Sequence, residues 1–315
     1  MHVLYFTNMW PTPERPGFGA FVRAQADSVK SLGVEVDVLS MLGGHPTVRY
    51  PLGLMHLRQR LREKRADLVH AHYGYSVALA SMQTKAPVVG SYCGSDLYSP
   101  RQRVLCSWAG RRIAVPIVKN EEMKRLLGRR DTVVLPNGVD LSVFRPGDRA
   151  DARRRLSLAP DGVHVLFPYD PGRREKRHDL ALETVRALQR STGRPASLLV
   201  VHDQDRETYL RHLHAADAML MTSAWEGSPN AVKEALACDL PVVSTRTGDV
   251  PAMVEGLRRS AAVEATPTSL AAALEIAITS EADGEGPVRM SAYSSETAAR
   301  RLLQCYRRAL GQDDA

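Results

Sequence analysis

The chain has 315 residues and a formal net charge of +7, and 44% of its residues are hydrophobic and 24% charged. This composition is that of a soluble globular protein with room for two domains of ordinary size. No apolar run approaches the roughly 20 residues that a membrane span needs, and the first residues lack the basic segment of a signal peptide, so the sequence predicts a cytoplasmic protein.

The charge is unevenly distributed along the chain. Residues 1–145 carry 20 Lys and Arg against 11 Asp and Glu, a net charge of +9, whereas residues 146–315 have a net charge of −2. Part of the excess lies in residues 56–65, an arginine-rich run in which Leu57 and Leu61 are one helical turn apart. A basic amphipathic helix suits an anionic surface or acceptor, and a solvated arginine-rich face is the alternative.

The first half of the chain alternates β-type and helical segments. Residues 3–7 form a short apolar run, and residues 21–32 have a helical periodicity that ends before Gly33, a typical C′ glycine. Further β-type runs lie at residues 34–39, 68–71, 88–91, 113–118 and 133–136. Strands that alternate with helices predict a parallel sheet covered on both faces.

A second series of the same kind starts at residue 163. An amphipathic helix is expected over residues 179–190 and a last helix over roughly residues 295–310. The β-type runs are residues 163–167, 197–201, 218–222, 241–244 and 261–264. The sequence therefore predicts an α/β protein with two successive parallel sheets.

The most informative segment is residues 225–236, Trp-Glu-Gly-Ser-Pro-Asn-Ala-Val-Lys-Glu-Ala-Leu. Glu226 is expected on a turn and Glu234 in the first turns of a helix. A helix N-terminus suits an anionic group such as a diphosphate, and a carboxylate one turn further in can accept hydrogen bonds from a ribose diol. The preceding strand would end at this loop, where open α/β sheets bind ligands. A capped helix without a ligand is the plainer interpretation.

This segment, continued through residues 240–244 and 248–250, resembles the donor site of glycosyltransferase family 4. Three further segments resemble motifs of that family in the same order: residues 67–72 at the end of an N-domain strand, residues 137–140 with 144–146 between the domains, and residues 175–181 at the diphosphate.

The resemblance implies a compact GT-B fold, in which two Rossmann-like domains face a cleft. Residues 1–145 would be the acceptor-side domain, residues 146–293 the nucleotide-sugar domain, and residues 294–315 a helix that crosses back to the first domain. It also implies a retaining, metal-independent enzyme that moves a sugar from a nucleotide-diphosphate donor, a UDP- or GDP-sugar, to a hydroxyl acceptor.

The same resemblance implies roles for single residues. Arg173 and Lys176 would hold the diphosphate and stabilise its growing charge, unless they belong to a basic surface loop. Glu234 would hold the ribose. Glu226 would act near the donor sugar by position and charge rather than as a nucleophile. His72 would contact the donor sugar, although a lone histidine is more often structural.

Two groups of small residues complete the predicted site. The turn Gly227, Ser228, Pro229 and Asn230 would bind sugar hydroxyls or phosphate. Gly17 and Gly19 resemble a glycine loop that approaches the diphosphate and the acceptor, or else form a simple turn.

The chain also departs from the family pattern. Residues 202–216 are shorter than the usual segment, which leaves the nucleotide base open, and Cys93 stands where a histidine is usual. The D-x-D at residues 203–205 is interpreted as a polar loop rather than a metal site. His70 would share a strand face with His72, but no third ligand has suitable spacing, so no metal is expected. The cysteines show no C-x-x-C pair and are expected to be reduced.

The sequence leaves two kinds of acceptor open. One is a cell-envelope glycan, which could be lipid-linked or anionic and reached by peripheral contact with the membrane; the other is a bacterial natural product. Nucleic acid is not expected, because residues 56–65 contain no aromatic side chain. Two alternatives are a GT-B sugar-nucleotide epimerase or hydrolase and a non-enzymatic binder of anionic surfaces.

Overall fold

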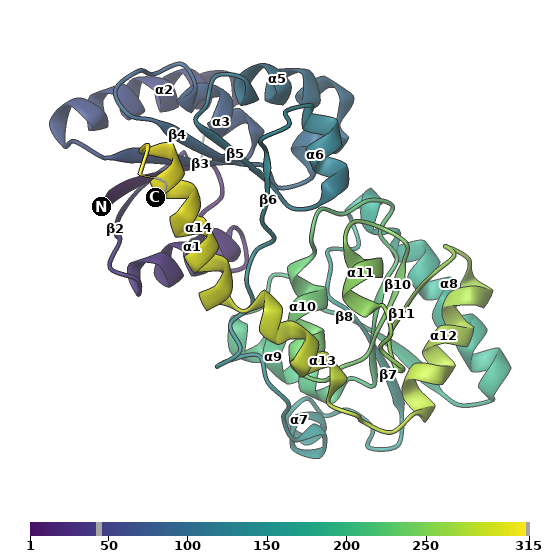
Figure 1. Ribbon diagram of the computed structural model, residues 1–315. Helices are drawn as coiled ribbons and strands as arrows, with labels where there is room; N and C mark the ends of the chain where they lie inside the picture. Colours follow the sequence, from purple (N-terminus) through teal and green to yellow (C-terminus); the bar gives the residue numbers. More distant parts are fainter. Residues whose placement is uncertain (42–45, 313–315) are drawn as a thin grey trace. The chain divides into compact units, whose positions relative to one another are not determined.

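The structure, a computed structural model, describes residues 1–41 and 46–312 (Figure 1). The chain divides into two compact units, one made of Met1–Gly138 and Ser295–Ala315 and the other of Val139–Ser294. The division thus falls after Gly138, seven residues before the boundary expected from the sequence. Each unit contains one parallel sheet, so the predicted α/β class with two Rossmann-like domains is confirmed.

The first unit is built on a parallel sheet of six strands in its described part, ordered β2-β1-β3-β4-β5-β6. Val3 pairs with Val36 on one side and with Leu68 on the other. Every residue of β3, β4 and β5 is buried, as in a sheet covered on both faces, and His70, His72 and Ser91 are the polar residues among them. The strands are β1 (His2–Thr7), β2 (Glu35–Ser40), β3 (Leu68–His72), β4 (Val88–Ser91), β5 (Val115–Val118) and β6 (Val133–Val134).

Helices cover both faces of this sheet. Figure 1 shows α1 and α14 on one face and α2, α3 and α5 on the other, and the two apolar cores of the unit divide in the same way. Leu57 and Leu61 of α2 are buried, as the amphipathic pattern predicts. The helices are α1 (Ala20–Lys30), α2 (Pro46–Glu63), α3 (Gly74–Ala80), α4 (Ser95–Tyr98), α5 (Pro100–Gly110), α6 (Glu121–Leu127) and α14 (Ser295–Ala309).

A buried chain of hydrogen bonds ties α14 to the sheet. The Tyr306 hydroxyl lies 3.0 Å from the Tyr5 hydroxyl and 2.8 Å from His70 Nδ1. His70 Nε2 in turn lies 2.8 Å from Ser91 Oγ. The last helix is therefore held by specific polar contacts as well as by the apolar side chains Leu302 and Ala299.

The second unit repeats the plan with a parallel sheet of five strands in the described chain, ordered β11-β10-β9-β7-β8. Its strands are β7 (Val163–Phe167), β8 (Ala196–Val200), β9 (Ala218–Met221), β10 (Val242–Thr245) and β11 (Ala261–Val263). Its helices are α7 (Arg149–Arg155), α8 (His178–Thr192), α9 (Arg206–Ala215), α10 (Asn230–Ala237), α11 (Val250–Val254), α12 (Pro267–Thr279) and α13 (Glu285–Met290), with short 3-10 turns η1 (Arg174–Lys176) and η2 (Ser291–Tyr293).

Both sheets have a switch point in their strand order. In the first unit the chain passes from β1 outward to β2 and then returns to place β3 on the other side of β1. In the second unit β7 is followed by β8 on one side and β9 on the other. Open α/β sheets bind ligands in the crevice beyond the carboxyl ends of strands at such a point, so the two positions between β1 and β3 and between β7 and β9 are where a site is expected.

Candidate active site

Two loops meet at the switch point of the second sheet. Lys176, after β7, donates from Nζ to Oε1 of Glu226, after β9, at 2.5 Å. Ser223 Oγ donates to the same carboxylate oxygen at 2.7 Å. The backbone joins the loops as well, because the Ala224 amide donates to the Glu175 carbonyl at 2.8 Å. Two predicted site residues that lie 50 positions apart in the sequence are thus in direct contact.

Tyr169 lies beside both Lys176 and Glu226. The Lys176 ammonium lies 4.2 Å from the centre of its ring, a distance at which the ring face attracts a cation. Burial raises the pKa of the Tyr169 phenol, and the nearby carboxylates of Glu226 and Glu234 raise it further. Sequence reasoning missed Tyr169; its position just after a strand that ends at the site was the available signal.

Glu234 lies one turn inside α10, near Tyr169 and Tyr209. Burial raises the pKa of its carboxyl, while the Tyr209 hydroxyl and the cations Lys233 and Arg206 lower it. Helix α10 begins at Asn230, so the predicted placement of this glutamate within the helix is confirmed. A carboxylate held there can accept hydrogen bonds from the hydroxyl groups of a ligand.

Arg173 and Lys176 have different surroundings, although the sequence suggests a pair. The Lys176 side chain is only 6% exposed, whereas that of Arg173 is 52% exposed. Arg173 donates from Nε to Glu175 at 2.7 Å. Lys176 is therefore the buried cation of the site, and Arg173 is a surface cation that already forms an ion pair.

The turn before α10 is fixed by a buried lysine and a neighbouring glycine. Lys233, which is fully buried, donates from Nζ to Ser228 Oγ at 3.1 Å. Gly248 has φ +58°, and a Cβ there would lie 2.7 Å from the Gly227 carbonyl oxygen. Pro229 has no N–H, so of the four predicted turn residues it can shape the turn but cannot donate to a ligand. Lys233 is thus a further residue of the site, one to which the sequence pattern alone gives no role.

His72 lies at the switch point of the first sheet. Its ring is 1% exposed, and Nε2 lies 2.8 Å from Gln25 Oε1 of α1. Burial, with the Lys119 cation as a second cause, lowers the pKa of His72 to about 3. The imidazole is therefore neutral at physiological pH, where it can position a group but does not supply a proton. His70 shares its face of the strand as predicted, with ring centroids 4.0 Å apart.

The two glycines of the predicted glycine loop differ in their backbone requirements. Gly19 has φ +74° at the start of α1, and a Cβ there would lie 2.5 Å from the Met9 carbonyl carbon. Gly17 would have no heavy atom within 4 Å of an added Cβ. The backbone thus requires glycine at position 19 and not at position 17.

The loop after β4 is organised by a buried aspartate. Asp96 accepts hydrogen bonds from the amides of Gly94 at 2.8 Å and of Gly74 and Cys93 at 3.0 Å. Burial, followed by the Asp96 charge, raises the pKa of the Cys93 thiol to about 12. Lys119, 2% exposed, also lies among these groups, and burial lowers its pKa. The Cys93 thiol is therefore protonated at physiological pH, and Lys119 is a buried cation that the sequence pattern does not reveal.

The D-x-D segment serves a local structural purpose. Asp205 caps the N-terminus of α9, where its carboxylate accepts from the Thr208 amide at 2.9 Å. His212 and His214 of the same helix contact different carbonyls, those of Thr208 and Arg145. Asp205 is therefore a helix-capping residue in the loop before α9.

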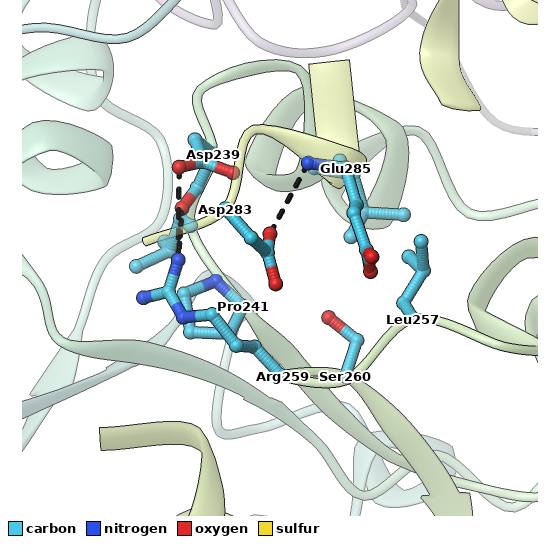
Figure 2. A pocket seen from close by; sticks show the side chains of 10 residues that line it. Asp239, Pro241, Leu257, Arg259, Ser260, Asp283 and Glu285 are labelled. Carbon is cyan, nitrogen blue, oxygen red and sulfur yellow. Dashed lines mark hydrogen bonds and ion pairs between the residues drawn. The ribbon is translucent and has the colours of Figure 1, made fainter. Parts of the chain in front are cut away.

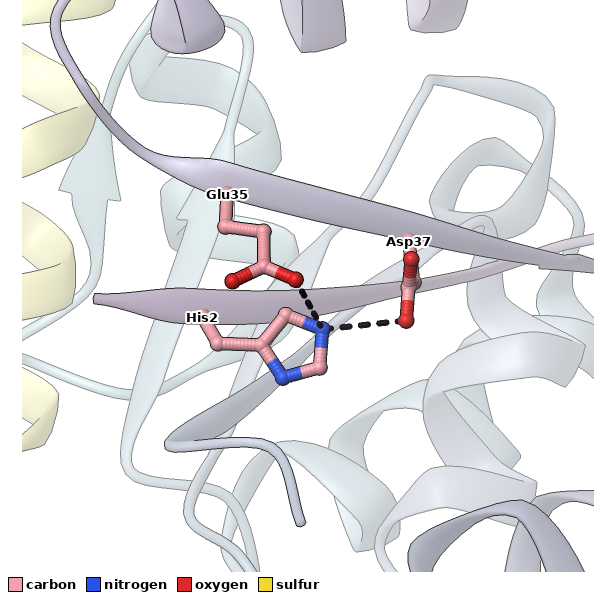
Figure 3. Close-up of side chains that lie close together, drawn as sticks. All are labelled: His2, Glu35 and Asp37. Atoms are coloured by element: carbon pink, nitrogen blue, oxygen red, sulfur yellow. Dashed lines mark hydrogen bonds and ion pairs between the residues drawn. The ribbon is translucent and has the colours of Figure 1, made fainter. Parts of the chain in front are cut away.

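One group of possible metal ligands occurs within the described residues, formed by His2, Glu35 and Asp37 (Figure 3). His2 Nε2 lies 3.1 Å from Asp37 Oδ2. The same carboxylates already bind cations: Lys64 lies 2.8 Å from Glu35, and Arg60 lies 2.6 Å from Asp37. The group lies toward the amino ends of β1 and β2, away from the ligand-binding edge of the sheet, and we interpret it as an ion-pair network.

A small cavity lies near the amino end of β10 (Figure 2). It has a volume of ≈ 10 Å³, about the space of a single water molecule. Arg259 lines it and forms an ion pair with Asp239 at 3.6 Å. This cavity is too small for a sugar nucleotide, and it lies near the amino end of β10 rather than at the carboxyl ends of the strands.

Comparison with known proteins agrees with this geometry. The family model described as Glycosyltransferase Family 4 matches residues 2–143, and the model described as Glycosyl transferases group 1 matches residues 200–280. The second match contains Glu226, Glu234 and Asp249. 

Solved glycosyltransferases share the fold over nearly the whole chain. Sucrose-phosphate synthase from Thermosynechococcus elongatus has a TM-score of 0.79 at 17% identity, covering 98% of this chain and 99% of its own. HepE of Anabaena, solved in complex with UDP, has a TM-score of 0.70 at 16% identity, covering 96% of this chain and 99% of its own. These likenesses show that the chain has the GT-B fold, with two Rossmann-like domains.

Relatives in sequence have related names. TuaC of Bacillus subtilis, named as a glycosyltransferase of teichuronic acid biosynthesis, is 25% identical over 80% of this chain and 83% of its own. D-inositol 3-phosphate glycosyltransferase of Mycobacterium marinum is 28% identical over 78% of this chain, which spans 64% of that relative. The chain belongs to glycosyltransferase family 4, and the predicted family is confirmed.

Proposed function

We propose that this glycosyltransferase is retaining and metal-independent, and that it transfers a sugar from a UDP- or GDP-sugar to a hydroxyl acceptor. The observation that carries the proposal is the contact between Lys176 and Glu226 at the switch point between β7 and β9. This contact brings a buried cation and a carboxylate together at the edge of the sheet where we expect the nucleotide diphosphate and its sugar to bind.

Departure of the nucleotide diphosphate builds negative charge that the protein must stabilise. Lys176 is preorganised for this work, because Glu226 and the Tyr169 ring hold its ammonium in one place. An ammonium has three N–H groups, and the bond to Glu226 uses one. Arg173, on the same loop but exposed, would add a second cation by exchanging Glu175 for a phosphate oxygen.

Glu226 is better suited to position the donor than to attack it. One of its carboxylate oxygens accepts hydrogen bonds from both Lys176 and Ser223. These bonds orient the carboxylate and lower the nucleophilicity of that oxygen. We therefore propose that the acceptor attacks from the face that the diphosphate leaves, assisted by the departing phosphate, which retains the anomeric configuration.

Binding measurements with sugar nucleotides test the donor site. We expect a UDP- or GDP-hexose to raise the melting temperature in a panel that includes a TDP-hexose as the third base. HepE, of the same fold, is named in complexes with UDP and UDP-glucose. If none of the panel binds to a folded sample at millimolar concentration, the placement of the donor site is wrong.

The alternative chemistry on this fold is a sugar-nucleotide epimerase or hydrolase. Membership of the transferase family favours sugar transfer over these reactions. It also disfavours the second alternative, a non-enzymatic protein that only binds anionic surfaces. Donor turnover with and without an acceptor separates the two reactions: transfer requires the acceptor for rapid turnover, whereas a hydrolase or epimerase proceeds at full rate without it.

The surface of α2 supports an acceptor at a membrane. Val48, Leu52 and Met55 form an exposed stripe at helical spacing, with exposed fractions of 56%, 41% and 53%. Gln59 and Arg62 continue the same stripe. A helix face that joins apolar side chains to arginine suits the interface of an anionic bilayer. Among the described residues no helix has the length and apolar composition to cross a membrane.

We therefore propose a lipid-linked or otherwise anionic acceptor, with a cell-envelope glycan as the first choice and a natural product as the second. Co-sedimentation with vesicles tests this. Wild type should bind vesicles with anionic lipid at low salt, and Leu52→Asp/Arg62→Glu should not. Arg194→Glu, an exposed charge reversal in the second unit, is the matched control. Equal sedimentation of all three would favour a water-soluble acceptor.

A further inference from the structure

The switch point of the first sheet carries a group of polar and aromatic side chains that the donor site does not use. Asn8 directly follows β1, and Tyr73 directly follows β3. The two strands pair as far as their last residues, so both residues leave the sheet at its carboxyl edge. Helices α2 and α3 supply the remaining members. The group, which we call the Arg49 cluster, consists of Asn8, Arg49, Tyr50, Tyr73 and Tyr75.

Arg49 and Asn8 converge on one hydroxyl group. The Tyr50 hydroxyl accepts a hydrogen bond from Arg49 Nη2 at 3.3 Å and one from Asn8 Nδ2 at 3.5 Å. The Arg49 guanidinium also lies 4.9 Å from the centre of the Tyr50 ring, and this ring stacks on that of Tyr75 with centres 4.9 Å apart. A guanidinium held on an aromatic face keeps its other N–H groups available for a ligand.

Two polar atoms of the cluster lack partners. Arg49 is partly buried and forms no ion pair with a carboxylate of the described residues. Its Nε and the Oδ1 of Asn8 are both buried, and neither has a hydrogen-bond partner in this part of the chain. Buried charges and polar atoms are normally paired, because the loss of water is otherwise uncompensated. The Arg49 N–H requires an acceptor and the Asn8 oxygen requires a donor, so an oxyanion and a hydroxyl group together would satisfy both.

The backbone of Tyr73 is strained at the same place. Its φ of 75° and ψ of 144° form a combination that residues other than glycine rarely adopt. Specific contacts maintain it: the Tyr73 hydroxyl donates to Gln102 Oε1 at 3.0 Å, and the Tyr73 amide donates to the Ser91 carbonyl at 2.9 Å. The conformation places the Tyr73 ring 6.1 Å from that of Tyr75. Strain of this kind is concentrated at binding sites, where the surrounding structure maintains it.

We propose that the Arg49 cluster is an acceptor subsite, which binds a sugar or polyol that carries both a hydroxyl group and an oxyanion, a carboxylate or a phosphate. Arg49 would donate charge-assisted hydrogen bonds to the oxyanion, and Asn8 Oδ1 would accept from a neighbouring hydroxyl. This inference rests on the proposed transfer to an anionic acceptor, and it names the residues that would recognise that acceptor.

NMR titrations with glucuronate, glucose 6-phosphate and glucose test the subsite. Saturating UDP or GDP, whichever binds more tightly, occupies the donor site, so that the phosphate probe does not bind there. The wild type should bind one of the two acidic sugars about tenfold or more tightly than glucose, the scale of a charge-assisted hydrogen bond. The preferred acid distinguishes a carboxylate from a phosphate. Arg49→Met should remove the preference, and Arg111→Met, which changes an exposed and solvated arginine of the same unit, should retain it.

Asn8→Asp tests the missing counter-ion directly. The new carboxylate would lie beside Arg49 and form the ion pair within the protein. Affinity for the preferred acid should therefore fall about tenfold or more, while the melting temperature should not decrease. Affinity for UDP or GDP should stay unchanged in all three variants, and circular dichroism checks that each variant is folded.

The outcomes separate the subsite from the donor site. Equal affinity of the wild type for glucose and both acids would overturn the inference, as would a preference that persists in Arg49→Met or in Asn8→Asp. A loss of nucleotide affinity in Arg49→Met would also overturn it, because Arg49 would then bind the donor. If the wild type binds neither UDP nor GDP, the proposed donor site itself is wrong.

Discussion

Replacing Lys176 by methionine should destabilise the second unit and inactivate the enzyme, and the two effects can be separated. The Lys176 and Glu226 side chains are 6% and 12% exposed. Removing one partner of a buried ion pair leaves the other charge uncompensated, which typically costs about 3–5 kcal/mol. We expect the lower end, about 3 kcal/mol, because Ser223 still donates to the Glu226 carboxylate.

The double variant Lys176→Met/Glu226→Gln removes both charges. Its free energy of unfolding should lie above that expected from adding the two single effects, with a coupling of about 1–3 kcal/mol. Activity should behave differently. The single variant Lys176→Met should lower kcat by roughly 10²-fold or more, the scale of one preorganised charge partner, and the double variant should not recover it.

Urea denaturation and initial rates at saturating donor measure the two effects. Arg174→Met is the matched control, because Arg174 is an exposed cation on the same loop; its stability and rate should stay close to those of the wild type. Recovery of activity together with stability in the double variant would refute the reasoning, since Lys176 would then serve only as the counter-ion of Glu226. An unchanged urea midpoint in Lys176→Met would show that the ion pair between Lys176 and Glu226 does not stabilise the second unit.

Three further predictions concern the donor site, the last helix and metal dependence. Glu234→Ala should abolish detectable sugar-nucleotide binding by calorimetry, because the ribose loses its acceptor, and wild-type affinity would disprove the placement of the ribose. Tyr306→Phe leaves the buried Tyr5 hydroxyl and His70 Nδ1 without this partner, so urea denaturation should show a loss of about 1–3 kcal/mol, whereas a loss below about 0.5 would mean that the network is unimportant. Activity should survive EDTA; full loss that Mn²⁺ restores would implicate a metal.

The fold was predictable because its signals are local. Mostly apolar runs such as residues 163–167 and 218–221 mark the strands of a sheet buried on both faces, and each is followed along the chain by helical periodicity. The placement of Glu226 on a turn and Glu234 in a helix also followed from residues close in sequence. Segment bounds were less certain: the run expected at residues 113–118 forms a strand only over Val115–Val118.

The partners of the site residues depend on the sheet order, which no local pattern contains. Arg173 and Lys176 are three positions apart, and from the sequence we predict that both hold the diphosphate. The order β9-β7 brings the Glu226 loop against Lys176, while Arg173 stays at the surface with Glu175. Tyr169 was given no role for the same reason, because the two glutamates beside it, Glu226 and Glu234, come from the segments that follow β9.

The sequence by itself determined the two parallel sheets, the family and the segment that carries the donor motif, since all three depend on the order of residue types along the chain. Only the tertiary structure decided that Lys176 is buried against Glu226 and that His72 is a neutral imidazole. Burial and charge at these positions are set by side chains distant in sequence, and the desolvation they impose exists only after the strands have paired.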